Sequence, residues 1–199
     1  AAKEGLESYH DQQEGTNWIF SRGIPSIKNK FSRSYLISSL GKFHFAETND
    51  ILLRLLRQSN DLELLIPVLE AISELNFESS ISDLIQASKN PLYKRNYGFR
   101  KSLFDALIQF PDKNVVEFFI NTLSENEGLN AVQTEEYLKL VTGTTQVGSK
   151  NWLKWWGENK NSIVIRKVTL EEINAKVLVA KPLGEVKDYY GISLLAKRI

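Results

Sequence analysis

The 199-residue sequence contains no cysteine, no methionine and only two histidines. Without cysteine the chain cannot form a disulfide, use a thiol nucleophile or build a cysteine-type zinc site. The histidines, His10 and His44, stand alone, and neither has a second histidine at the spacing of metal ligands. We therefore expect no metal site and no cofactor, and we interpret His44 as a structural or solvated turn residue.

Long apolar runs and phosphate-binding loops are missing as well. No window approaches the 18 apolar residues of a membrane-spanning helix. Residues 143–148 (G-T-T-Q-V-G) lack the Lys-Ser/Thr ending of a phosphate-binding loop. Carboxylate pairs such as Glu135 and Glu136 are adjacent in sequence, so they diverge on a helix. We expect a chain that is not an enzyme, has no small-molecule substrate and does not span a membrane.

The amino end gives a limited indication of location. The chain starts Ala1-Ala2 without a methionine and shows no charged-then-apolar signal peptide. Such a start fits a removed signal peptide or a cloned fragment of a longer protein. The compartment stays open, with the periplasm favoured over the cytoplasm only by this small-residue start.

Apolar residues recur at helical spacing over residues 27–161. Equivalent positions lie 32, 35 and then 34 residues apart, and three sets follow this interval: Leu36, Val68, Leu103 and Tyr137; Leu40, Ile72, Leu107 and Val141; Phe43, Leu75 and Phe110. Each interval predicts a helix, a turn and a second helix. A hairpin of this length cannot bury its apolar stripe alone, so successive hairpins should stack. We predict an all-α fold, a right-handed α-solenoid of about four hairpins.

The helix boundaries follow from turn and capping residues. The expected turns are residues 44–47, 76–78 and 111–114, and the expected caps are Thr48, Ser79 and Asn114. Pro67 removes a backbone donor, so it should kink its helix or delay its start. Gly98 should interrupt the stretch 92–110 in the same way.

Three of the four tryptophans lie within residues 151–161. On a helix, Trp152, Trp155 and Trp156 share one broad face. We predict that they form a structural wedge that closes the stack of helices. Either Trp155 or Trp156 should be nearly fully buried, with Trp152 nearer the edge, and a longer loop over residues 143–149 should precede the wedge.

The sequence divides into three segments. Residues 1–26 are polar with isolated apolar points, and we expect a helical cap or arm in which Trp18 packs on the first hairpin. Residues 27–161 carry the repeats. Residues 162–199 carry two runs rich in valine and isoleucine, 163–165 and 177–179, which predict short strands in a C-terminal tail.

Two motifs close the repeat region, L-K-L-V-T-G at residues 138–143 and W-L-K-W-W at residues 152–156. With them the chain resembles bacterial HEAT-like repeat proteins. The tail, with Y-Y-G-I at 189–192 and K-R-I at 197–199, looks like the lead-in to a von Willebrand factor type A domain of larger bacterial proteins. The resemblance implies a partner-binding region ahead of such a domain, whose metal-binding motif is not in this sequence.

Five cations without an acid lie between residues 89 and 101: Lys89, Lys94, Arg95, Arg100 and Lys101. They alternate with Tyr93, Tyr97 and Phe99, a mixture that suits a solvated helix face, an acidic protein partner, or a nucleic acid with stacked bases. Residues 1–149 carry 15 basic and 19 acidic residues, a balance that repels a long polyanion.

The most consistent interpretation is a non-enzymatic protein-protein interaction or scaffold module of a larger bacterial protein. The predicted partner-binding residues are Lys94, Arg95, Arg100 and Lys101. The alternative is a nucleic-acid-binding helical-repeat protein.

Overall fold

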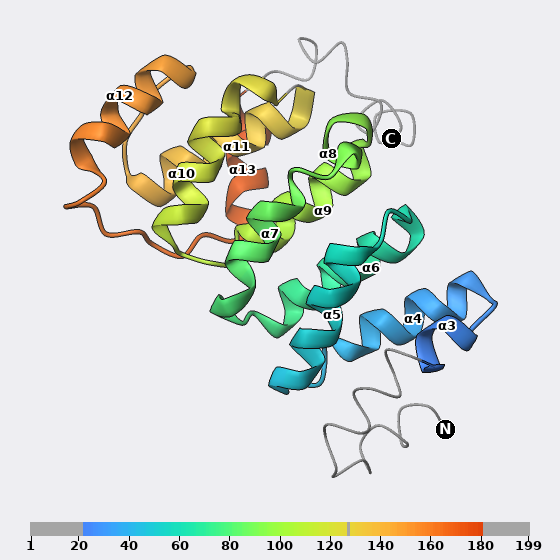
Figure 1. The fold of residues 1–199 in the computed structure, drawn as a ribbon. Helices are drawn as coiled ribbons and strands as arrows, with labels where there is room; N and C mark the ends of the chain where they lie inside the picture. The colour runs from blue at the N-terminus through green and yellow to red at the C-terminus, as the bar shows by residue number, and fades with distance from the viewer. Residues whose placement is uncertain (1–21, 127, 181–199) are drawn as a thin grey trace. The chain divides into compact units, whose positions relative to one another are not determined.

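The computed structural model describes residues 22–126 and 128–180 (Figure 1). Every regular element in these ranges is a helix, and the ranges contain no strand. The packing expected for Trp18 and the motifs from residue 189 onward lie outside the described residues. Contacts divide the chain after Leu107, so unit 1 (to Leu107) and unit 2 (from Ile108) are described separately.

Unit 1 contains seven described α-helices: α3 (Ile24–Ser26), α4 (Lys30–Leu40), α5 (Ala46–Gln58), α6 (Leu62–Leu75), α7 (Ile81–Ala87), α8 (Pro91–Arg95) and α9 (Tyr97–Leu107), with a 3-10 turn η2 (Glu78–Ser80) before α7. The described part of unit 2 contains α10 (Lys113–Thr122), the 3-10 turn η3 (Leu123–Glu125), α11 (Gly128–Thr142), α12 (Ser149–Asn159) and α13 (Leu170–Ala180).

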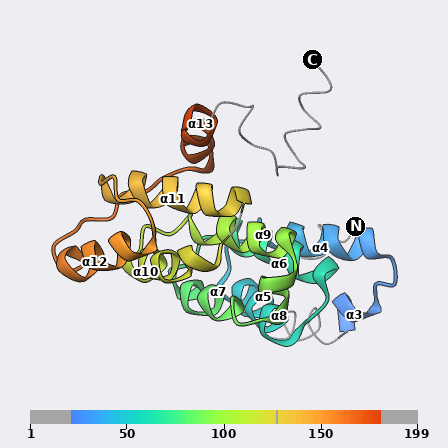
Figure 2. The same cartoon turned by 90° about the horizontal axis from the view of Figure 1, so that it is seen from above.

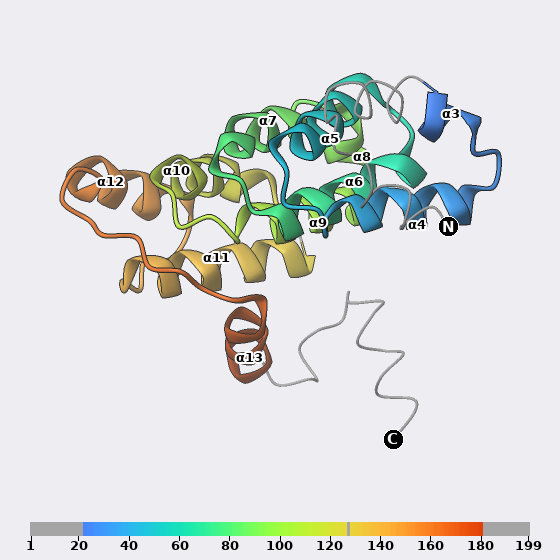
Figure 3. The same cartoon turned by 90° about the horizontal axis from the view of Figure 1, so that it is seen from below.

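The helices of unit 1 form two layers. Figures 2 and 3 show α4, α6 and α9 side by side in one layer, with α5 and α7 in the other. In the first layer α6 packs against both α4 and α9, and in the second α5 packs against α7. The first layer is tight at Gly41, where an added Cβ would lie 2.9 Å from the Cα of Ala71.

Polar contacts join one hairpin of unit 1 to the next. The Ser80 hydroxyl donates to Oδ1 of Asn49 at 2.8 Å, and both side chains are buried. At the surface, Nη2 of Arg57 donates to Oδ2 of Asp83 at 2.7 Å. The partners are 31 and 26 residues apart, so each contact fixes how one hairpin meets its neighbour.

The predicted all-α class is confirmed in the described residues. Nine of the eleven repeat positions are buried and the other two, Leu36 and Phe43, are half-buried. The predicted pairs of helices are present at these intervals. The right-handed α-solenoid stays a prediction.

Several predicted boundaries are wrong. Helix α6 begins at Leu62, five residues before Pro67, because the Asp61 carboxylate accepts a hydrogen bond from the Glu63 amide at 3.0 Å. The delayed start is therefore wrong, and the kink at Pro67 stays a prediction. The break expected at Gly98 falls at Asn96, between α8 and α9.

The predicted caps are also displaced. Helix α5 follows Phe45 without a side-chain cap, rather than starting at Thr48. No side-chain cap is formed at the start of η2 or of α7, so Ser79 does not serve as one. Helix α10 is capped by Oδ1 of Asp112, which accepts from the Asn114 amide at 2.6 Å, and Asn114 is therefore inside the helix.

In unit 2, α11 lies between α10 and α13, and α12 packs on α10 (Figures 2 and 3). The side-chain amide of Gln133 on α11 donates to Oδ1 of Asn174 on α13 at 2.8 Å. The Nε of Arg166 donates to the Leu140 carbonyl at 2.8 Å, near the end of α11. These contacts attach α13 and the segment before it to α11.

The strands predicted for the tail are wrong. Residues 163–165 are irregular, and residues 177–179 lie in α13. Helix α13 starts with a capping box, in which the Thr169 amide donates to Oε2 of Glu172 at 2.9 Å and the Glu172 amide donates to the Thr169 hydroxyl at 3.3 Å. The capping box starts a helix, and the valine-rich run continues it.

Candidate functional site

The basic cluster predicted from the sequence surrounds the bend between α8 and α9, here called the α8–α9 elbow (residues 90–101). Asn90 caps the start of α8, and its Oδ1 accepts from the Leu92 amide at 2.9 Å. Asn96 ends this helix, because its backbone is extended (φ −128°, ψ 118°), although its amide still donates to the Leu92 carbonyl at 2.8 Å. The Oδ1 of Asn96 then accepts from the Phe99 amide at 2.9 Å. One asparagine therefore ends α8 and caps α9.

Arg100 fixes the angle of the elbow. Its Nη1 donates to the carbonyl oxygens of Tyr93 and Lys94 at 2.9 and 3.0 Å. These carbonyls belong to the last turn of α8, where a helix lacks internal partners and carries partial negative charge. Arg100 is thus bound to the protein's own backbone, and we assign it a positioning role.

Lys101 is also engaged within the protein. Its ammonium contacts Oδ1 and Oδ2 of Asp105 at 2.5 Å, one helical turn along α9. Burial raises the pKa of Asp105 above its ordinary value, while the hydrogen bond from Lys101 acts in the opposite direction. The charge of Lys101 is therefore balanced locally.

Lys94 and Arg95 are the exposed cations of the elbow. Both belong to the last turn of α8, and neither takes part in an ion pair within residues 22–126 and 128–180. The four predicted site residues therefore divide into an outward pair, Lys94 and Arg95, and a pair held by the fold, Arg100 and Lys101.

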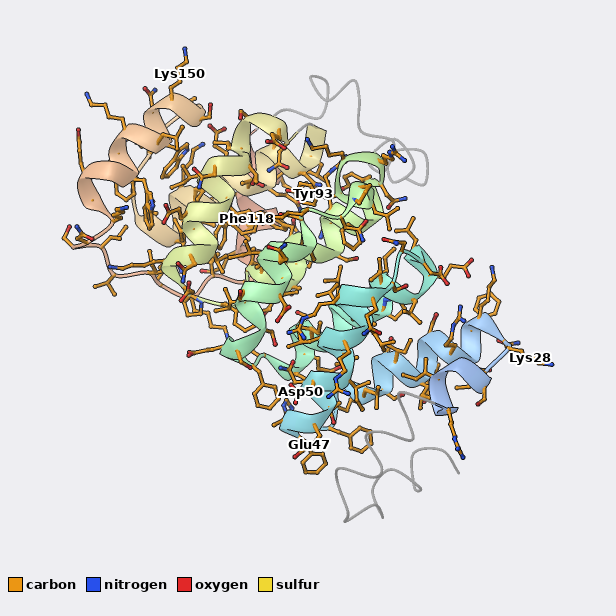
Figure 4. All side chains as sticks on the ribbon, in the orientation of Figure 1. Lys28, Glu47, Asp50, Tyr93, Phe118 and Lys150 are labelled. Carbon is orange, nitrogen blue, oxygen red and sulfur yellow. The ribbon has the colours of Figure 1, made fainter. Side chains whose placement is uncertain are left out.

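The aromatic residues of the elbow face mainly inward. Tyr93 is 7% exposed and Phe99 is fully buried, whereas Tyr97 is 47% exposed. Figure 4 shows where Tyr93 lies on the ribbon. Stacking of nucleic-acid bases requires exposed ring faces, and two of the three rings do not offer them.

Asn90 and Asn96 shape the elbow without carrying charge, and neither was among the site residues predicted from the sequence. The pair Asn90-Pro91 was a readable signal, because proline is favoured in the first turn of a helix behind an asparagine cap. Asn96 gave no such signal, since the residues on both sides of it are helical.

The three tryptophans of the predicted wedge lie in α12. Trp152 is fully buried, Trp156 is 4% exposed and Trp155 is half-buried. The rings of Trp152 and Trp155 meet edge to face with centroids 5.8 Å apart. The burial of Trp156 confirms one prediction, while the edge position expected for Trp152 is wrong because its side chain is fully buried.

Within the described ranges, no three histidine, cysteine or acidic side chains converge to hold a metal ion. None of the helices described is both long and apolar enough to cross a bilayer. Comparison of the chain with family models, curated proteins and solved structures finds no match. The resemblance to HEAT-like repeat proteins and to a type A domain lead-in stays a prediction.

Proposed function

We propose that the chain is a non-enzymatic protein-interaction module and that the α8–α9 elbow binds an acidic surface of a partner protein. The observation that carries the proposal is the pairing of two exposed cations, Lys94 and Arg95, with a backbone held by Asn96 and Arg100. A held backbone limits the ordering cost of binding.

The chemistry of the pair favours carboxylates. Lys94 and Arg95 are successive residues of one helical turn, so their side chains leave the backbone in different directions. Two carboxylates on a folded surface can meet both cations, and the guanidinium of Arg95 can bind one of them through two hydrogen bonds. Exposed charges of this kind speed association and select partners more than they add affinity.

The same surroundings argue for protein over nucleic acid. The buried Tyr93 and Phe99 cannot stack on bases. Residues 1–149 carry more acidic than basic residues, so a long polyanion would meet repulsion beyond the elbow.

The wider architecture that fits this function is a right-handed, HEAT-like solenoid within a larger bacterial protein. Support comes from the side-by-side packing of α4, α6 and α9 and from the contacts that recur between hairpins of unit 1. Stacked hairpins create extended surfaces that suit protein partners.

The test compares two double charge reversals. Lys94→Glu/Arg95→Glu changes the elbow, and Lys150→Glu/Lys154→Glu makes the same charge change on exposed residues of α12, where Lys150 points away from the helix (Figure 4). Both variants should keep the parent circular dichroism and thermal unfolding, because exposed charges contribute little to stability. We expect the elbow variant to lose most capture of a partner from the source cell, measured by quantitative mass spectrometry, and the α12 variant to retain it.

Two results would contradict the proposal. Equal capture by both folded variants would remove the elbow from the binding site. Salt-sensitive retention of the parent on duplex DNA, lost in the elbow variant alone, would instead support the nucleic-acid alternative.

A further inference from the structure

Helix α4 exposes the aromatic pair Phe31 and Tyr35, and the exposed lysines Lys28 and Lys42 lie just before and just after the helix. These four residues are here called the α4 outer face. Phe31 is 87% exposed and Tyr35 is 75% exposed, and one helical turn separates them. Lys28 points outward at the start of this helix (Figure 4). An aromatic pair this exposed is unusual on a soluble surface and indicates a binding face.

The 32-residue repeat interval relates this face of α4 to one side of α6. The positions 32 residues after Phe31 and Tyr35 are Glu63 and Pro67 on α6. Glu63 faces α4, because its carboxylate binds the Lys30 ammonium at 2.8 Å and its carbonyl accepts from the Ser34 hydroxyl at 3.2 Å. Pro67 is buried. The α4 outer face therefore corresponds to the side of α6 that the preceding helix covers.

The charges around this face have one sign. Residues 22–46 include five basic residues and no acidic residue. Lys30 and Arg33 pair with Glu63 and Asp61 on α6. Lys28 and Lys42 are exposed and make no ion pair with any described residue. An occupant of the face should therefore carry acidic residues together with apolar ones.

A segment with this composition precedes the face in the same chain. Residues 1–21 contain one lysine against four acidic residues, Glu4, Glu7, Asp11 and Glu14, and then the apolar run Trp18-Ile19-Phe20. The segment joins the described chain at Arg22, next to α3, which packs on α4. We propose that residues 1–21 bind the α4 outer face, with residues 18–20 covering Phe31 and Tyr35 and the acidic residues near Lys28 and Lys42.

The chain's own segment fits better than a second copy of the face. Two copies meeting through α4 would bring like charges together, which costs free energy. An attached segment binds at a high effective concentration that a separate molecule does not have.

The absence of cysteine allows a direct test on the full chain. Gln13→Cys introduces the sole thiol, which is modified with a nitroxide spin label. Amide signals of residues 28–42 in the ¹⁵N-labelled protein should lose more than half of their intensity, while those of α12 should change little. Adding Lys28→Glu/Lys42→Glu should restore most of the lost intensity, and adding Lys150→Glu/Lys154→Glu should not.

Three outcomes would overturn the proposal. Unchanged α4 signals would show that residues 1–21 do not bind this face. Loss that persists in the Lys28→Glu/Lys42→Glu variant would remove the charge argument. Spin-labelled chain without ¹⁵N can be mixed with ¹⁵N-labelled chain that lacks the label, and broadening of α4 signals in this mixture would identify a second copy as the occupant.

Discussion

Replacing Gly41 by alanine has two opposite effects on the free energy of unfolding. Gly41 follows α4 with φ −58° and ψ −19°, a right-handed helical conformation that alanine adopts without strain. If nothing else opposed it, Gly41→Ala would raise the free energy of unfolding by about 0.4–1 kcal/mol, because alanine restricts the unfolded chain.

The neighbouring helix opposes the change. The new Cβ would lie 2.9 Å from the Cα of Ala71 and 3.0 Å from its carbonyl oxygen. Both are backbone atoms of α6, so relief requires α4 and α6 to move apart along their packed surface. Overpacking of this kind costs about 1–3 kcal/mol, and the expected net result is a loss of roughly 1–2 kcal/mol.

Gly157→Ala provides the matched control. Gly157 lies within α12, and an added Cβ there meets nothing within 4 Å. Removing a glycine from an exposed helix interior should raise the free energy of unfolding by about 0.5–1 kcal/mol.

Urea unfolding followed by circular dichroism measures both effects. Hydrogen exchange of α4 and α6 amides assigns the loss in the Gly41 variant to unit 1. If Gly41→Ala stabilises the protein as much as Gly157→Ala does, the close approach of α4 to α6 is incorrect.

Four further substitutions test unit 2. Trp152→Ala and Trp156→Ala should each lower the free energy of unfolding by about 3–5 kcal/mol because both rings are buried, and urea midpoints equal to the parent would contradict the wedge. Asp112→Ala should lower it by about 0.5–2 kcal/mol through loss of the α10 cap, and an unchanged midpoint would show that Asn114 or water replaces the cap. Hydrogen bonds from the Thr169 amide and Arg166 lower the pKa of Glu172 below its ordinary value of 4.5, so its stabilising effect is present above that pH and is lost as pH falls through the lowered pKa. Glu172→Gln should remove this part of the acid sensitivity of α13, measured by amide exchange against pH, and an unchanged profile would place the acid sensitivity elsewhere.

The core of the fold was predictable because helix periodicity and repeat interval agree. Val68, Leu103 and Tyr137 were aligned by the interval alone, and all three are buried. Apolar residues that recur on one side of a helix are buried where that side packs, and this spacing can be read directly from the sequence. Helix starts were less predictable, because Asp112 and Asn114 are both good caps and only the backbone conformation chooses between them.

The tail was predicted to form strands, although the sequence also contains a motif that starts a helix. Thr169 and Glu172 have the T-x-x-E spacing of a capping box, but the following Val177-Leu178-Val179 run is short and rich in β-branched residues. Such a run does not distinguish a strand from a helix by periodicity. The capping box formed by Thr169 and Glu172 decides in favour of a helix.

The basic residues located the candidate site in the sequence, but they did not show which of the cations are exposed. The pairing of Lys101 with Asp105 could be read from a four-residue spacing. The bonding of Arg100 to the carbonyls of Tyr93 and Lys94 could not, because it depends on the angle between α8 and α9. Sequence composition therefore overestimated the number of exposed cations.

The loop between α11 and α12 offers a point of attachment for protein engineering. Gly143 and Gly148 flank it with φ of 72° and 79°, and a Cβ added at either position meets nothing within 4 Å. Val147 within the loop is 64% exposed, and exposed loop tips are the places where chains accept inserted sequence. Because the chain has no cysteine of its own, a short insert carrying one thiol here would couple the protein to a sensor surface through a single defined site in unit 2.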